Sequence, residues 1–133
     1  MNKIQKVADF LETAGTFSLA TVDSTLPKCR PMSGLYSKDD TLYFCVGTFK
    51  EAYRQMQENP YVEISVCQGM AWLRYYGKAV FEQDDVIPTI MIDTLGLGEI
   101  YNEETGHKLA AFHLEDATAE FRDLMDITEK ITF

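Results

Sequence analysis

Residues 41–60 read TLYFCVGTFKEAYRQMQENP, a pattern that predicts a strand turning directly into a helix. In the first half, Leu42, Phe44 and Val46 alternate with residues that point the other way, which is the two-residue period of a strand with one face in the core. Gly47 then allows the backbone to turn. A junction of this kind between a strand and a helix offers a natural place to hold an anion.

The helix of this stretch is predicted to begin with a capping box. Thr48 is a candidate N-cap and Glu51 follows three residues later, so the first helical residue should be Phe49. The N–H groups of the first turn, the positive end of the helix dipole and the ammonium of Lys50 would together favour a phosphate or carboxylate. The alternative is that Thr48 only caps the helix and Lys50 is a solvated surface lysine.

The rest of the chain predicts a single mainly β domain over residues 1–133. Apolar residues at helical spacing predict an N-terminal helix over residues 1–14, and Asp84 opens a second inserted helix. Gly77 implies a bend in a long strand, and such bends curl a sheet into a barrel. We therefore expect a barrel of six or seven mostly antiparallel strands with three helices. The predicted strands cover residues 17–22, 28–33, 41–46, 61–67, 70–83, 108–114 and 117–122, the last two joined as a pair at 115–116, with a short tail strand over 127–133.

The balance of charge excludes some classes of partner. The chain has 21 acidic and 12 basic residues, which gives a formal net charge of -9. Nucleic acid and anionic membranes are bound through clusters of Lys and Arg instead. No signal peptide and no run of about 18 apolar residues is present. The three cysteines lack CxxC spacing, which fits reduced thiols. We therefore expect a cytoplasmic protein that binds neither nucleic acid nor membrane.

Few residues could carry chemistry by themselves. The two histidines, His107 and His113, have no familiar metal-ligand spacing, so no metal site is predicted. No serine stands in a Gly-x-Ser-x-Gly elbow, and Gly-Leu-Gly at 96–98 lacks the third glycine of a dinucleotide fingerprint. The catalytic residues are therefore not identified from the sequence.

One set of residues could converge on a flat, anionic, aromatic ligand. It combines Arg30, the helix start from Thr48 to Lys50, and Trp72 with Arg74. Arg30 is suited to this task because a guanidinium can fork onto a phosphate. The alternative is that Arg30 and Arg74 pair with some of the many acids and that Trp72 only covers the core.

The order of several segments resembles the pyridoxamine 5'-phosphate oxidase-related flavoproteins, and within them the subgroup of nitroimidazole-resistance proteins. The segments are FSLATVD, PKCRPM, LYFC, TFKEAYRQMQENPYVEI and WLRYYGKAVF. They cover most of residues 1–83, with a looser match at 117–121. The resemblance implies an FMN-binding split β-barrel homodimer with one FMN per subunit in the cleft between chains. It also implies an FMN-dependent oxidoreductase acting on a small-molecule redox substrate.

The resemblance further implies a set of cofactor-binding residues. Arg30 falls on the phosphate side of the flavin, and Lys50 matches the phosphate lysine at the helix start beside Thr48. Trp72 occupies a position from which the partner chain reaches the cofactor. The residues implied to run along or face the isoalloxazine ring are Pro31, Met32, Ser33, Phe44, Cys45 and Val46.

The chain departs from its relatives at the phosphate loop. Where they often have Thr-Ser-Asn-Thr-Lys, this chain has Val-Gly-Thr-Phe-Lys at 46–50, so Val46 gives up a hydroxyl and Phe49 replaces a small polar residue. This leaves open a non-catalytic binding or sensing module that uses the same cleft for haem, a deazaflavin or no cofactor. The chain also lacks a counterpart of the C-terminal substrate segment of true pyridoxamine phosphate oxidases, so vitamin B6 synthesis is not predicted.

Overall fold

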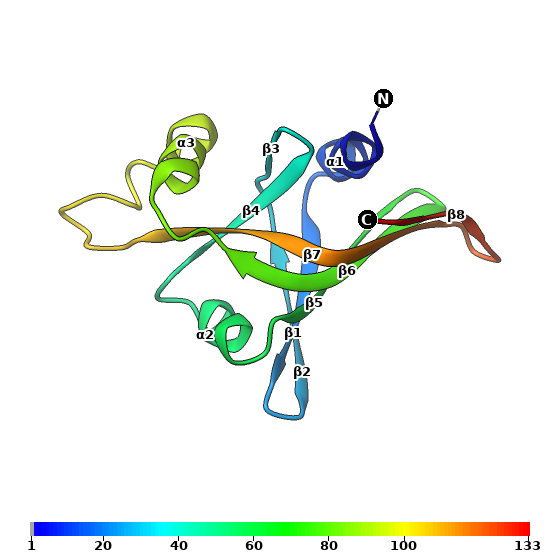
Figure 1. Cartoon of the computed structure of the whole chain (residues 1–133), viewed down its shortest axis with the longest axis horizontal. Helices are drawn as coiled ribbons and strands as arrows, with labels where there is room; N and C mark the ends of the chain where they lie inside the picture. The colour runs from blue at the N-terminus through cyan, green and yellow to red at the C-terminus, as the bar shows by residue number, and fades with distance from the viewer. Residues whose placement is uncertain (1) are drawn as a thin grey trace.

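The computed structural model describes residues 2–133, which form three helices and eight strands (Figure 1). The helices are α1 (Lys3–Ala14), α2 (Glu51–Glu58) and α3 (Val86–Leu95). The strands are β1 (Phe17–Asp23), β2 (Leu26–Met32), β3 (Tyr36–Lys38), β4 (Thr41–Gly47), β5 (Tyr61–Gln68), β6 (Ala71–Phe81), β7 (Leu109–Arg122) and β8 (Ile127–Thr132).

All eight strands belong to one antiparallel sheet with the order β2-β1-β5-β6-β7-β4-β3, and β8 is added to β7. The long strand β7 pairs with β6 along one edge. Along its other edge, residues 109–112 pair with β4 and residues 118–122 pair with β8. The end strands β2 and β3 do not pair with each other within residues 2–133, so the barrel stays split, as the sequence leads one to expect.

Two predictions for the strands were wrong. Residues 109–122 form one continuous strand instead of a pair joined at Glu115 and Asp116. The register with β6 shifts at Gly77: Lys78 pairs with Glu115 and Tyr76 pairs with Thr118, so Asp116 and Ala117 form a bulge opposite one residue. Asp116 adopts φ +51° there, and the chain continues without reversing. Residues 36–38, expected in a connection, form β3 on the edge of β4. The merged strand removes one member of the predicted set and β3 adds one, and with the tail strand β8 the sheet has eight strands.

The N-terminal helix is confirmed from Lys3 onward, and residue 1 of the predicted range lies outside the described residues. The Asn2 side chain caps α1 by accepting from Gln5 N–H at 2.7 Å, and Gly15 with φ +92° ends it. None of the helices within residues 2–133 has the length and apolar character needed to cross a bilayer.

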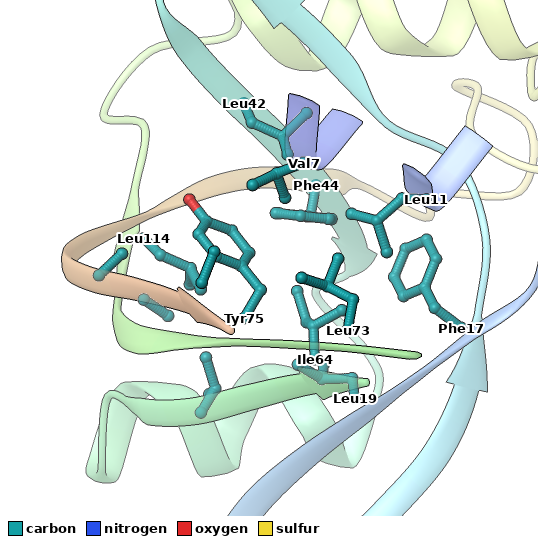
Figure 2. Close-up of a cluster of buried hydrophobic side chains, with 14 of the residues drawn as sticks. Val7, Leu11, Phe17, Leu19, Leu42, Phe44, Ile64, Leu73, Tyr75 and Leu114 are labelled. Atoms are coloured by element: carbon teal, nitrogen blue, oxygen red, sulfur yellow. The ribbon is translucent and has the colours of Figure 1, made fainter. Parts of the chain in front are cut away.

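The main core lies between the curved sheet, α1 and α2, and Figure 2 shows its centre. Phe44 is fully buried there, and its ring centroid lies 5.7 Å from that of Phe17 and 5.6 Å from that of Phe112. A smaller apolar cluster, which includes Cys45 and Met91, lies beneath α3. The strand β4 is therefore buried on both faces, and this fixes the position of the chain where β4 leads into α2.

Candidate functional site

The ends of β2 and β4, the start of α2 and the loop after α3 surround a cavity of about 470 Å³, here called the Arg30 cavity. Its wall is mostly apolar, and its charged groups are two cations and one carboxylate in a chain of net charge -9. Mostly apolar cavities of this size with a few polar groups are typical of cofactor sites. The lining residues are Arg30, Pro31, Met32, Ser33, Cys45, Val46, Gly47, Lys50, Glu51, Ala52, Leu97, Ile100, Tyr101 and Leu109.

Arg30 is held in the wall by neutral groups. Its Nη1 donates to Leu19 O at 3.1 Å and Thr21 Oγ1 at 2.8 Å, and its Nη2 donates to Gln55 Oε1 at 2.9 Å. A guanidinium has five N–H donors, so two remain for a ligand. Arg30 forms no ion pair within residues 2–133, whereas Arg74 pairs with Glu63 at 2.8 Å. The alternative that these arginines pair with acids therefore holds for Arg74 and not for Arg30.

The start of α2 differs from the predicted capping box. The ladder between β4 and β7 continues one residue further, because Thr48 N–H donates to Lys108 O at 2.9 Å. Thr48 is therefore held in the turn that follows β4 and does not line the Arg30 cavity. The turn closes when Lys50 N–H donates to Gly47 O at 3.0 Å, and the helix begins at Glu51. The prediction of Thr48 as N-cap was wrong.

Lys50 is the N-cap residue instead, and no side chain caps the helix. The N–H groups of Glu51 and Ala52 consequently have no acceptor among residues 2–133, and both residues line the Arg30 cavity. The ammonium of Lys50 lies 5.3 Å from the ring centroid of Phe49. The exposed Glu51 carboxylate is the opposing charge. The cavity thus joins two cations to an uncapped helix start, which favours an anion.

The end of β4 supplies the middle of the wall. Cys45, Val46 and Gly47 line the cavity, whereas the Phe44 side chain points into the core. Burial raises the pKa of Cys45 to about 11, so this residue is a neutral thiol at physiological pH. Pro31 and Met32 at the end of β2, and Ser33 directly after it, line the same cavity.

The wall opposite β2 was missed by sequence reasoning. It consists of Leu97, Ile100 and Tyr101 from the loop after α3, together with Leu109 at the start of β7. The loop shows neither helical nor strand periodicity, so it appears in the sequence as an irregular segment. Its one local signal is the presence of three large apolar or aromatic residues in a connecting segment.

Trp72 does not reach the Arg30 cavity of its own chain. It lies in a separate groove between α1 and the strands β6 to β8. Its indole N–H donates to Asp123 O at 3.1 Å, and the Arg122 guanidinium lies 5.2 Å from the ring centroid. Within one chain, the expected convergence of Arg30, Lys50 and Trp72 therefore holds for the two cations and not for the tryptophan.

Comparison with known proteins identifies relatives of this fold. The sequence model of the pyridoxamine 5'-phosphate oxidase family matches residues 4–120. The structure is similar to that of a NimC/NimA family protein from Clostridium acetobutylicum, with a TM-score of 0.84 and 23% identity over 98% of this chain and 90% of that one. No curated protein sequence matches.

Two further solved structures share the fold at lower identity. A pyridoxamine 5'-phosphate oxidase-related, FMN-binding protein from Nostoc punctiforme gives a TM-score of 0.63 at 15% identity over 95% of this chain and 86% of that one. A heme-binding protein from Mycobacterium smegmatis gives 0.70 at 12% identity over 99% of this chain but 59% of that one. At these identities the solved structures support the split-barrel fold alone.

Proposed function

The chain belongs to the pyridoxamine 5'-phosphate oxidase family, and we propose that it binds FMN in the Arg30 cavity and acts as an FMN-dependent oxidoreductase on a small molecule. The observation that carries the proposal is the environment of Arg30. Its guanidinium is fixed at the cavity by neutral partners, with two N–H donors unused and no carboxylate paired to it within residues 2–133. A positioned cation without a counter-anion favours a phosphate.

The phosphate of FMN would be held where the two cations meet the start of α2. Arg30 would offer its two unused N–H donors, and Lys50 a mobile ammonium. The N–H groups of Glu51 and Ala52 add donors that no side chain caps. The donor set therefore fits a phosphate group, in spite of the Glu51 carboxylate at the rim.

The ring system of FMN would lie along the apolar part of the cavity. Pro31, Met32 and Ser33 offer one surface, and the backbone of residues 45–47 offers a second. Leu97, Ile100 and Tyr101 of the loop after α3 add further apolar and aromatic surface to that space. When bound, FMN supplies the redox chemistry, while these residues bind and orient it. The substrate would then be a small molecule that enters the remaining space beside the ring.

Haem is supported less well than FMN as the ligand of this cavity. A haem iron needs an axial His, Cys, Met or Tyr ligand. Among the described lining residues there is no histidine, and burial raises the pKa of both Cys45 and Tyr101, so losing the proton to bind iron would cost more at either residue than at an exposed one. Met32 is the remaining candidate, and it offers one weak thioether. A deazaflavin would share the phosphate contacts and is distinguished from FMN by its mass and spectrum.

A homodimer is part of the same proposal. Trp72 lies outside the Arg30 cavity of its own chain, so a second chain is needed for it to reach a bound flavin. The outer face of β6 also shows Tyr76 and Val80 half-buried, and such a surface suits association of two copies. Light scattering at micromolar concentration should give twice the mass of one chain, and a monomer would contradict this part.

A comparison of FMN with riboflavin tests the proposal, because the two ligands differ only by the phosphate. Apo-protein is titrated with each ligand while flavin fluorescence is followed. The unaltered chain should bind FMN more tightly. Lys50→Ala and Arg30→Ala should each weaken FMN binding by roughly tenfold to a hundredfold, the worth of a charge-assisted hydrogen bond, and change riboflavin binding little.

Lys28→Ala is the matched control, since Lys28 lies exposed on β2 and outside the cavity. It should leave both affinities unchanged. Arg30→Ala also removes three internal hydrogen bonds, so its folding is checked by circular dichroism, and the exposed Lys50 provides the cleaner variant. A purified chain that is colourless and takes up no added FMN would refute the proposal. Mass spectrometry of any ligand that copurifies would separate FMN from a deazaflavin or haem.

A further inference from the structure

The loop after α3 is held by its own hydrogen bonds where it lines the Arg30 cavity. Tyr101 N–H donates to Leu97 O at 3.1 Å, which tightens the first turn. Thr105 N–H donates to Asn102 Oδ1 at 2.9 Å, and the Thr105 hydroxyl donates to Ile100 O at 2.6 Å. These bonds tie the segment to itself on both sides of Tyr101. The ring of Tyr101 is therefore presented to the cavity by an ordered segment.

The Tyr101 hydroxyl lies beside the turn that leads into α2. A Cβ built on Gly47 would be 2.9 Å from this hydroxyl and 2.6 Å from the Phe49 ring. Phe49 in turn stacks on His107 with ring centroids 4.1 Å apart. Since Gly47 O accepts the Lys50 N–H, the hydroxyl lies next to the turn that carries the Lys50 cation.

This hydroxyl has no hydrogen-bond partner within residues 2–133. By contrast, the Tyr76 hydroxyl donates to Glu120 Oε2 at 2.5 Å. Tyr101 is half-buried, and a phenol in that position ordinarily finds a partner. Burial raises the pKa of Tyr101, and the nearby Cys45 raises it further, so the hydroxyl keeps its proton at neutral pH. The cavity thus contains an oriented neutral donor that the protein itself does not use.

Building on the proposed function, we propose that Tyr101 is a further phosphate-binding residue, whose hydroxyl donates to the phosphate of FMN beside the start of α2. The positive groups that line the same cavity are Arg30 and Lys50. A neutral donor in that lining adds a hydrogen bond without the desolvation cost of a third charge. It also gives this chain a phosphate donor in place of the polar side chains that Val46 and Phe49 do not supply.

The test removes one oxygen atom and compares two ligands. Tyr101→Phe keeps the ring that packs near Phe49, and the missing hydroxyl made no internal hydrogen bond, so the melting temperature should not change. FMN affinity should fall by roughly tenfold, the worth of a hydrogen bond to a charged acceptor. Riboflavin affinity should stay within about twofold. Tyr53→Phe is the control, because Tyr53 lies on α2 and outside the cavity.

The outcomes separate this inference from the proposed function. A chain that prefers FMN over riboflavin, and keeps that preference undiminished in Tyr101→Phe, supports the function and overturns the role of Tyr101. An equal loss for both flavins also overturns it, because the hydroxyl would then act on the ring or on the cavity wall. An unaltered chain that binds neither flavin overturns both proposals. A selective loss for FMN, absent in Tyr53→Phe, supports the inference.

Discussion

Gly77→Ala should destabilise the fold at the bend of β6. Gly77 lies where the register between β6 and β7 shifts, and it is paired on its other side with Val62 of β5. A Cβ built there would lie 2.7 Å from Glu115 O and 3.0 Å from Ala117 Cα, whereas ordinary contacts begin at 3.4 Å. Both obstacles are backbone atoms of a central strand, so no side-chain rotation relieves the clash.

The magnitude follows from two opposing effects. Overpacking of a well-packed site costs about 1–3 kcal/mol. Replacing glycine by alanine returns about 0.4–1 kcal/mol where the backbone tolerates it, because the unfolded chain loses freedom. Gly98→Ala is the matched control, since its Cβ would meet nothing within 4 Å and its φ is not positive. The unfolded-chain effect acts on both variants and cancels in their difference, so their free energies of unfolding should differ by the overpacking cost, about 1–3 kcal/mol.

Urea denaturation followed by far-ultraviolet circular dichroism measures this difference. The midpoint of Gly77→Ala should fall below that of the unaltered chain, with an unchanged slope, while the midpoint of Gly98→Ala should stay equal or rise. If Gly77→Ala were as stable as Gly98→Ala, the bulge would not require a glycine. The argument that a close backbone approach bends this strand would then be wrong.

Glu120→Gln should make the free energy of unfolding less sensitive to a fall in pH. The Tyr76 hydroxyl, then Arg122 and Arg74, lower the pKa of Glu120, so the carboxylate stabilises the fold above its unfolded pKa of about 4.3 and this stabilisation is lost as the pH falls. The gap in unfolding free energy between the two proteins should shrink from pH 6 to pH 3, and a constant gap would contradict the assignment. Native protein at pH 8 should react with iodoacetamide at the two exposed cysteines and spare Cys45, because burial keeps that thiol protonated. Three adducts formed at one rate would contradict it.

Local patterns in the sequence determined most of the fold. The alternation at residues 61–67 matches β5 within one residue, and the helical spacing of the first residues matches α1. These elements each bury one face, so the period of their apolar residues records their conformation. Arg30 and Lys50, which the sequence offers as candidate anion-binding residues, both line one cavity in the structure.

Only the tertiary structure decided how that cavity is completed. Thr48, followed by Glu51 three residues later, has the sequence pattern of an N-cap. Its N–H nevertheless donates to the carbonyl oxygen of Lys108, a residue 60 positions away, and the helix begins only at Glu51. The loop that carries Tyr101 has no periodic pattern, and its place beside the cavity comes from packing of Leu97 and Tyr101 on the cluster that contains Cys45 and Leu109. Short-range order could therefore be predicted from the amino acids, whereas the partners of Arg30 and the far wall of its cavity depend on contacts between distant segments.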